Sequence, residues 1–148
     1  MKKILLDTNF LLIPYQFKVD IFSEIDRIIL EKYQICILDK TIDELNKIIR
    51  DKEQKLKNRL AATLALQLVK AKDVKIIKTK LSNKSEKGFE VQKELQRQDK
   101  SVDDIIAELK GYIIATQDIL LRKRLKHLKK GIITLRQKKY LIYKTESF

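Results

Sequence analysis

The stretch Ile4-Leu5-Leu6-Asp7-Thr8-Asn9 decides the fold, because a short apolar run stops there at three polar residues. Consecutive aliphatic residues are typical of a strand that is covered on both faces, and the polar residues that follow indicate a turn. Strands of this kind form parallel sheets, and ligands bind beyond the carboxyl ends of such strands. The sequence therefore predicts that Asp7 stands at the edge of a sheet where an active site would form.

The rest of the chain alternates between strand and helix patterns. Further strands are predicted at residues 34–38, 74–77, 112–115 and 132–135, and helices at 20–33, from 39 or 41 to 49, 52–72, 102–109 and 119–128. Such alternation is typical of an α/β fold, so we expect a single domain over residues 1–148: a three-layer α/β/α sandwich around a mainly parallel sheet of about five strands. Residues 78–100 break the pattern with seven basic and four acidic residues, and are predicted to be a mobile basic insertion.

Five carboxylates fall close to the predicted turns. Asp7 follows the first strand directly, and Asp118 follows the fourth strand after two residues. Glu44 lies in the first turn of the helix after the second strand, and Asp103 and Asp104 lie in the first turn of the helix before the fourth. If this last helix packed straight, its start would lie at the opposite edge of the sheet, so we expect the long segment before it to place its start at the site.

The chemistry that such acids would perform depends on a metal. Clustered carboxylates repel one another, and a hard divalent cation such as Mg²⁺ or Mn²⁺ relieves this repulsion. The ion makes a bound water acidic enough to attack a phosphodiester and stabilises the leaving oxygen. No histidine is needed, and His127 is the only one, which excludes a two-histidine ribonuclease mechanism. Alternatively, Glu44 and Asp104 only cap or solvate their helices.

The charge of the chain favours a polyanionic partner. It has 33 Lys and Arg residues against 20 acids, a net charge of +13, and residues 119–148 hold ten basic residues and one acid. This concentration favours nucleic acid, although a lysine-rich proteome would also raise the total. Tyr140 and Tyr143 either stack on unpaired bases or pack against the domain. The residues predicted to contact RNA are Arg122, Arg124, Lys126, Arg136, Lys138 and Lys139.

Cysteine content and hydropathy narrow the class of protein further. Cys36 is the only cysteine and lies in the apolar run 35–38, so we expect a core residue, no disulfide and a reducing cytoplasm. No apolar run approaches the ~20 residues of a membrane span. No glycine-rich phosphate-binding motif is present, which argues against nucleotide-binding α/β folds.

Four motifs, in this order along the chain, resemble those of PIN domains: residues 4–9, Ile42-Asp43-Glu44-Leu45, residues 103–107 and residues 113–118. The resemblance implies a metal-dependent endoribonuclease in which Asp7, Glu44, Asp103 and Asp118 hold Mg²⁺ or Mn²⁺, with Asp104 as a further ligand. It also implies that Asn9 and Thr116 support the ligands by hydrogen bonds. From the residues alone, Asn9 is equally a turn residue and Thr116 a neighbour of a helix N-cap.

The C-terminal part resembles one branch of the family more closely. Residues 114–118, followed by Arg122-Lys123-Arg124-Leu125, Gly131 and residues 136–140, are similar to the PIN nuclease of small-subunit ribosomal RNA processing. That likeness implies precursor ribosomal RNA as the partner. Two alternatives stay open: a VapC-like toxin paired with an antitoxin, and a non-catalytic RNA-binding PIN scaffold, since Leu120 stands where many relatives carry another acid. The family also allows a homodimer.

Overall fold

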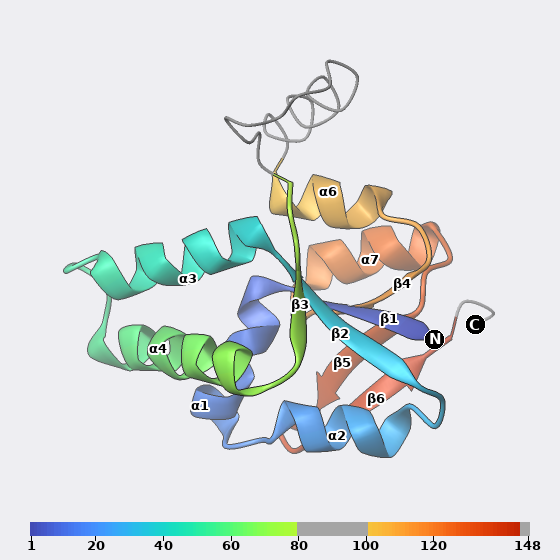
Figure 1. Ribbon diagram of the computed structural model, residues 1–148, viewed down its shortest axis with the longest axis horizontal. Coiled ribbons are helices and arrows are strands. Elements are labelled where there is room, and N and C mark those ends of the chain that lie inside the picture. The colour runs from blue at the N-terminus through green and yellow to red at the C-terminus, as the bar shows by residue number, and fades with distance from the viewer. Residues whose placement is uncertain (80–100, 146–148) are drawn as a thin grey trace.

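A six-stranded sheet forms the centre of the described chain, which comprises residues 1–79 and 101–145 of the computed structural model (Figure 1). Its order is β3-β2-β1-β4-β5-β6, and neighbouring strands are parallel except for the antiparallel pair β5 and β6. The predicted mainly parallel sheet is confirmed, with one strand more than expected. The strands are β1 (Lys2–Leu6), β2 (Tyr33–Leu38), β3 (Val74–Ile77), β4 (Tyr112–Ala115), β5 (Ile132–Arg136) and β6 (Tyr140–Lys144).

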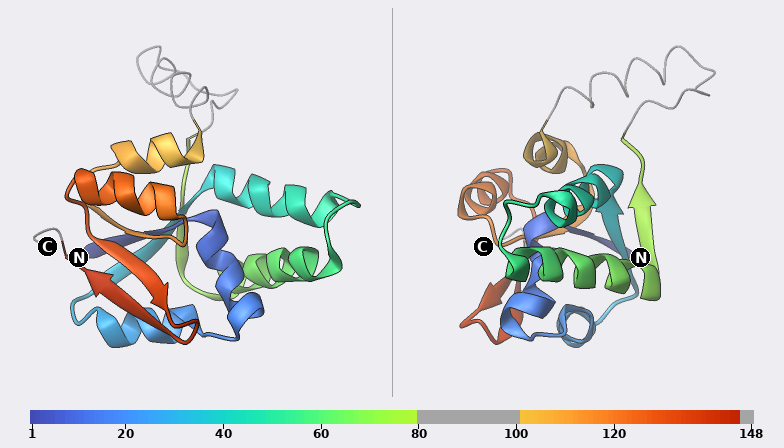
Figure 2. Two further views of the ribbon diagram at one scale, coloured as in Figure 1. Left: turned by 180° about the vertical axis from the view of Figure 1, so that it is seen from behind. Right: turned by 90° about the vertical axis from the view of Figure 1, so that its left-hand side faces the viewer.

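Helices cover both faces of this sheet, so the three-layer prediction is also confirmed (Figures 1 and 2). On one face lie α6 (Val102–Glu108) and α7 (Ile119–His127). The other face carries the 3-10 helix η1 (Thr8–Leu12), α1 (Ile13–Phe17), α2 (Ile21–Ile28), α3 (Asp39–Arg50) and α4 (Leu56–Ala71). None of the helices in the described part of the chain combines the length and apolar character that a membrane span requires.

The surroundings of strand β1 explain why its consecutive aliphatic residues indicate a buried central strand. Ile4 and Leu6 belong to the core beneath α2, α3 and α4, while Leu5 belongs to the second core beneath α6 and α7. All three side chains are fully buried. Successive side chains of a strand point to opposite faces, so a strand covered on both faces needs aliphatic residues throughout. Cys36 in β2 is buried in the second core, as expected.

Strand β6 and the helices before α2 were not predicted. The turn between β5 and β6 places Gln137 and Lys138 at φ 55° and 58°, and the Lys139 N–H donates to the Arg136 carbonyl at 3.1 Å. Tight hairpins with two such residues usually carry Asn or Gly there, so the sequence lacks the ordinary hairpin signal. Residues next to and within helix η1 stabilise it: Asp7 is its N-cap, and its apolar side chains Phe10 and Leu11 are buried.

The start of α6 lies at the carboxyl edge of the sheet, the edge where the parallel strands end. The start was expected at this edge, but the premise that a straight helix would begin at the opposite edge was wrong. A helix that connects two parallel strands runs antiparallel to them, so it starts where they end. Strand β3 already delivers the chain to this edge, because the Thr79 N–H and hydroxyl both donate to the Asp39 carboxylate at the start of α3. From residue 80 to 100, the predicted insertion lies outside the described residues.

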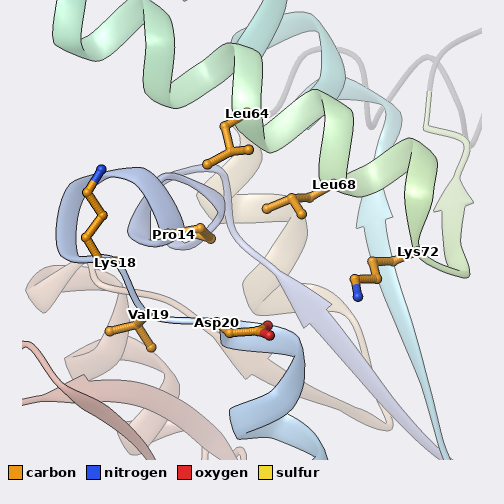
Figure 3. A pocket seen from close by; sticks show the side chains of 7 residues that line it. All are labelled: Pro14, Lys18, Val19, Asp20, Leu64, Leu68 and Lys72. Atoms are coloured by element: carbon orange, nitrogen blue, oxygen red, sulfur yellow. The ribbon is translucent and has the colours of Figure 1, made fainter.

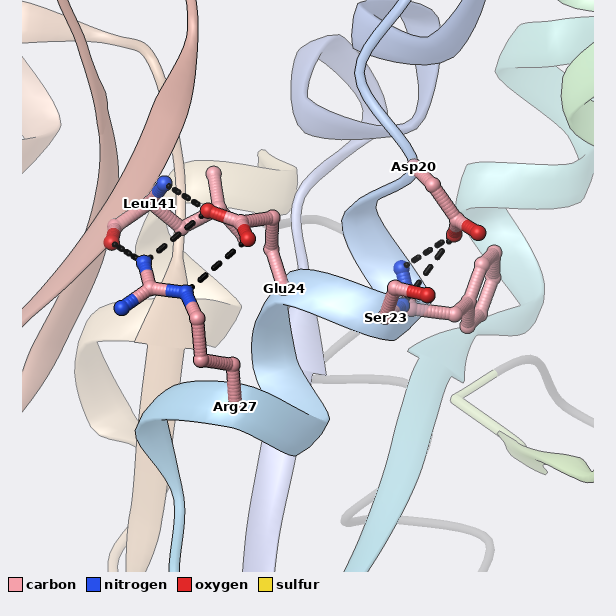
Figure 4. Close-up of polar contacts among 6 residues, drawn as sticks. Asp20, Ser23, Glu24, Arg27 and Leu141 are labelled. Carbon is pink, nitrogen blue, oxygen red and sulfur yellow. Dashed lines mark hydrogen bonds and ion pairs between the residues drawn. The ribbon is translucent and has the colours of Figure 1, made fainter.

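The outer edge of β6 is covered by two side chains of α2. Glu24 accepts a 2.9 Å hydrogen bond from the Leu141 N–H, and Arg27 donates a 3.0 Å bond to the Leu141 carbonyl (Figure 4). The same two side chains form a bidentate ion pair with each other. Unpaired edge strands invite pairing with other chains. The Glu24–Arg27 pair therefore takes the place of a neighbouring strand at Leu141.

Candidate active site at the carboxyl edge of the sheet

Asp7 is buried at the end of β1, and both oxygens of its carboxylate accept hydrogen bonds. Its backbone N–H donates to the Ala115 carbonyl at 2.9 Å, which extends the pairing of β1 with β4 by one residue. Its side chain is 5% exposed. One carboxylate oxygen accepts from the Thr8 N–H at 2.8 Å and the other from the Thr116 hydroxyl at 2.7 Å. Both oxygens are thus oriented by groups of the protein.

Thr116 connects two of the predicted ligands. It is fully buried, and while its hydroxyl donates to Asp7 it also accepts from the Asp118 N–H at 3.1 Å. Asn9 adds a second link across the same edge, because its side-chain oxygen accepts from the Gln117 N–H at 3.2 Å. The turn after β1 and the turn after β4 are therefore held together by side chains on both.

Glu44 reaches the same edge from α3. Its Oε1 accepts a 2.7 Å hydrogen bond from the Thr8 hydroxyl, and Thr8 also donates its N–H to Asp7. Glu44 is the sixth residue of α3, so it lies in the second turn rather than the first. The sequence prediction missed Thr8 as the residue that joins Glu44 to Asp7. Its position between Asp7 and Asn9 was the only signal that would have found it.

Asp118 is the N-cap of α7 and also lies at the carboxyl edge of the sheet. Its Oδ1 accepts from the N–H groups of Leu120 and Leu121, at 2.9 and 3.1 Å, and so caps α7. Within the described residues no hydrogen bond reaches its Oδ2. The capping role and a ligand role are therefore compatible, because they use different oxygens.

The acids repel one another across the site. The pKa of Asp7 is raised to about 6 from its ordinary value of 3.8, chiefly by burial and to a smaller extent by the nearby Asp103 and Glu44. The hydrogen bonds from Thr116 and Thr8 act in the opposite direction. The pKa of Asp103 is raised as well, by burial first and then by Asp118 and Asp104. Four carboxylates from four segments of the chain thus form one electrostatically coupled group.

The donor set of this group fits a hard divalent cation. Within the described residues, no three side chains of metal-binding type converge closely enough to enclose one ion together. Mg²⁺ commonly takes only one or two carboxylates and keeps several waters, so such an enclosure is not required. The ligands here are all oxygen atoms, and a cation beside Asp7 would stabilise its ionised carboxylate, which burial disfavours most and the neighbouring acids also disfavour.

Asp104 has a partner other than a metal. Its Oδ1 accepts a 2.8 Å charge-assisted bond from Arg124. This guanidinium is the main cause of the lowered pKa of Asp104, and Ser101 contributes as the N-cap of α6. The structure therefore pairs a predicted fifth ligand with a predicted RNA-binding residue.

The other predicted RNA-binding residues lie on α7 and on the β5–β6 hairpin. A groove of about 190 Å³ runs between α7 and the two strands, with Ile119, Ile132 and Thr134 among its lining residues and Arg122, Lys123, Lys126 and Lys144 supplying four cations. We call it the α7 groove. Arg136, Lys138 and Lys139 lie in and beside the turn at the carboxyl end of β5. Tyr143 instead packs against the core, with its ring against Gly131.

Arg122 is the best-positioned cation of the α7 groove. One terminal nitrogen donates to the Thr134 hydroxyl at 3.1 Å. Its Nε is buried and has no hydrogen-bond partner within the described residues. A buried donor without an acceptor is costly, so a ligand oxygen in the groove would be favoured. Arg122 also stands one helical turn after Asp118, which links the groove to the acids.

A larger pocket lies between α1 and α4, and none of these acids lines it (Figure 3). Its volume is about 280 Å³, and Pro14, Leu64 and Leu68 form much of its wall. Its one acid, Asp20, is used as the N-cap of α2, where it accepts from the N–H groups of Phe22 and Ser23 at 3.1 Å. One capped acid beside two lysines does not suit metal chemistry, so the carboxyl edge remains the candidate active site.

Comparisons with known proteins agree with the motif pattern. Residues 4–138 match the family model described as a PIN like domain. The chain is 30% identical over 140 residues to Ribonuclease VapC4 of Methanocaldococcus jannaschii, with 95% of each protein covered. It is also similar to the solved structure of the PIN domain endonuclease Utp24, with a TM-score of 0.67 and 22% identity, over 96% of this chain and 90% of that one. This last likeness shows a shared fold.

Proposed function

We propose that this chain, which belongs to the PIN-like domain family, is a divalent-metal-dependent endoribonuclease that hydrolyses RNA phosphodiester bonds. The observation that carries the proposal is the placement of Asp7. It is buried, oriented by Thr8 and Thr116, and coupled to Glu44 and Asp103 at the edge where active sites of parallel sheets form. Ribonuclease VapC4, similar over 95% of the chain, supports the assignment to RNA.

Asp7, Glu44, Asp103 and Asp118 are the residues that would hold Mg²⁺ or Mn²⁺. When bound, the ion supplies a Lewis acid at the phosphate and a more acidic water. Thr116 and Asn9 keep the Asp7 and Asp118 segments in place through their hydrogen bonds. Asp104 would join as a fifth ligand only after leaving Arg124.

The basic residues would position the RNA at this edge. Arg122 would receive a phosphate in the α7 groove, since its Nε is buried and unpartnered while Thr134 fixes the guanidinium. Lys126 lines the same groove, and Arg136, Lys138 and Lys139 would contact the backbone from the hairpin turn. Such contacts give affinity and register without reading the base sequence. Arg124 would contribute when it is released from Asp104.

The proposed ribonuclease activity fits two biological settings, and a third possibility is a protein without that activity. Processing of precursor ribosomal RNA follows from the resemblance of residues 114–140 to a ribosomal RNA processing nuclease. A VapC-like toxin with an antitoxin partner is supported by the 30% identity to Ribonuclease VapC4 over nearly the whole chain. A non-catalytic RNA-binding scaffold is the third reading, because Leu120 is apolar and exposed beside the acids. We further propose that the protein forms a homodimer and acts in the cytoplasm.

Cleavage assays test the activity and separate these settings. The protein is incubated with a small-subunit ribosomal RNA fragment or with transfer RNA, in Mn²⁺, Mg²⁺ or EDTA. We expect metal-dependent cutting that Asp7→Asn and Asp118→Asn abolish and that Asp73→Asn, an exposed acid at the other end of β3, leaves intact. Preference for transfer RNA would favour the toxin reading. Binding of RNA without cutting by any of these proteins would favour the scaffold.

A further inference from the structure

A second basic pocket lies at the opposite, amino edge of the sheet. Its volume is about 320 Å³, and its lining comes from four segments: the start of β1, the turn into β4, the end of α7 and strand β6. We call it the amino-edge pocket. The described residues that line it include four lysines and two tyrosines and no acid: Lys2, Lys3, Tyr112, Lys129, Lys130 and Tyr143.

The end of α7 is shaped to bring two of these lysines to the pocket. The Lys129 N–H donates to the Lys126 carbonyl and the Lys130 N–H to the Leu125 carbonyl, both at 3.0 Å. This is the helix ending in which a left-handed residue, usually glycine, follows the last turn. Lys129 occupies that position with φ 57°. This ending turns the chain at Lys129 and places its side chain beside that of Lys130 at the amino-edge pocket.

Two other lysines are fixed by contacts inside the pocket. Lys130 donates through Nζ to the Leu109 carbonyl, which anchors its side chain across the end of α6. Lys3 holds its Nζ 5.5 Å from the centre of the Tyr112 ring. Lys2 and Lys129 are exposed, and within the described residues neither forms an ion pair. Among the described residues, the pocket thus presents several positive charges around an aromatic wall, and no acid lines it.

We propose that the amino-edge pocket binds the RNA backbone at a distance from the cleavage site. This inference rests on the proposed ribonuclease function and specifies its substrate class: an RNA long enough to reach both edges of the sheet. Lysine ammonium groups bind phosphates as point charges. The Tyr112 ring beside them, which already holds the Lys3 ammonium, offers an edge on which an unpaired base can stack. An acidic peptide would use the lysines but not this ring, so RNA fits the lining better.

The geometry sets a minimum length for that RNA. Strand β1 runs from the pocket, at Lys2, to the acid group, at Leu6 and Asp7, and its five residues span about 16 Å at ~3.3 Å each. A stacked strand advances about 3.4 Å per nucleotide, so about five nucleotides separate the two sites. The α7 groove lies along this path, because its lining runs from Ile119 beside Asp118 to Lys144 beside Tyr143.

Binding measurements with a long unstructured RNA test the pocket. All proteins carry Asp7→Asn so that no cleavage interferes. One carries Lys2→Gln, Lys3→Gln and Lys129→Gln; a matched control carries Lys52→Gln, Lys55→Gln and Lys70→Gln, three exposed lysines of the loop before α4 and of its last turn. Lys130 is kept because its contact with Leu109 is structural. Thermal unfolding confirms that each variant folds.

The expected result is a loss of affinity confined to the pocket variant. Losing three phosphate contacts should weaken binding about tenfold or more and reduce the slope of log K against log salt by about 2, with little change in the control. Equal losses in the two variants would overturn the inference while leaving RNA binding intact. An equal loss of binding to polyglutamate would make the pocket a general anion site and overturn its assignment to RNA. Failure of every protein to bind RNA would remove the proposed function as well.

Discussion

The hydroxyl of Thr116 donates a 2.7 Å hydrogen bond to Oδ2 of Asp7, although the two residues lie 109 positions apart in the sequence. The parallel pairing of β1 with β4 makes this contact possible, because it sets Leu6 opposite Ala115 and so brings the two following residues together. The same hydroxyl accepts from the Asp118 N–H. One buried threonine therefore fixes the relative positions of two proposed metal ligands.

Replacing Thr116 tests whether its hydroxyl positions Asp7 and Asp118 or whether the side chain only fills buried space. Thr116→Val keeps the shape of the side chain but removes the donor to Asp7 and the acceptor for the Asp118 N–H. Loss of a supporting hydrogen bond typically lowers metal affinity about 10–100-fold. We expect this loss of Mn²⁺ affinity in calorimetric titration of Thr116→Val, and near wild-type affinity in Thr116→Ser, which retains the hydroxyl. Equal affinity in Thr116→Val and wild type would contradict the positioning role.

The raised pKa of Asp7 predicts how the metal-free protein responds to pH. Its folded pKa of about 6 exceeds the ordinary 3.8, so the folded state holds this proton more tightly than the unfolded chain. The resulting stability is fully present below the ordinary pKa and is lost as pH rises through 6. The free energy of unfolding should fall by about 1–3 kcal/mol across this range. Urea unfolding at several pH values measures it.

Two comparisons make the pH experiment specific. Asp7→Asn should reduce the fall in stability, leaving only a smaller contribution of the same sign from Asp103, whose pKa is also raised. Added Mn²⁺ should restore stability at neutral pH in the wild type, because it binds the ionised carboxylate and not the protonated form. A stability profile that is the same in Asp7→Asn and wild type would show that the Asp7 carboxyl titrates normally.

The ion pair between Asp104 and Arg124 makes opposite predictions for its two partners. Asp104→Asn should tighten RNA binding, because it releases Arg124 from its 2.8 Å contact. Arg124→Gln should weaken RNA binding, since it removes a cation. If Asp104 is instead needed as a fifth ligand, Asp104→Asn lowers Mn²⁺ affinity. Fluorescence anisotropy with labelled RNA and a parallel Mn²⁺ titration distinguish the two roles.

Arg122 should behave as a phosphate contact rather than a structural residue. Arg122→Gln is expected to weaken RNA binding for all sequences alike and to reduce the salt slope by about 1. Thr134→Val, which removes the acceptor that orients the guanidinium, should cause a smaller loss. Arg50→Gln, an exposed arginine at the end of α3, is the matched control. An unchanged salt slope in Arg122→Gln would remove this residue from the RNA path.

Most of the sheet could be predicted from the sequence, because its central strands are buried on both faces. Short continuous apolar runs indicate buried strands, and the chain has such runs at Ile4-Leu5-Leu6 and Ile35-Cys36-Ile37-Leu38. Strand β6 escaped prediction because its turn has Gln137 and Lys138 in left-handed conformation, where the sequence gives no glycine signal. The edge contact of Leu141 with Glu24 and Arg27 depends on tertiary structure alone.

The sequence was enough to place acids of the candidate site at one edge of the sheet. It did not predict the hydrogen bonds that connect these acids. Asp7 and Asp118 could be placed at one edge because each follows a parallel strand. The start of α6 was expected at this edge only with the help of the preceding segment, because the direction of the connecting helix was misjudged. The bonds through Thr8 and Thr116 join residues 36 and 109 positions apart. Neither these bonds nor the pairing of Asp104 with Arg124 follows from local sequence patterns.

Calorimetric titration of Mn²⁺ into the wild-type protein and into Asp7→Asn tests the central claim most directly, because it asks whether these acids bind a metal before any RNA is present. We expect the wild type and the control Asp73→Asn to bind Mn²⁺ with the same affinity, and Asp7→Asn to lose binding. Absence of binding in the wild type, or undiminished binding in Asp7→Asn, would contradict a metal-dependent active site at the carboxyl edge of the sheet.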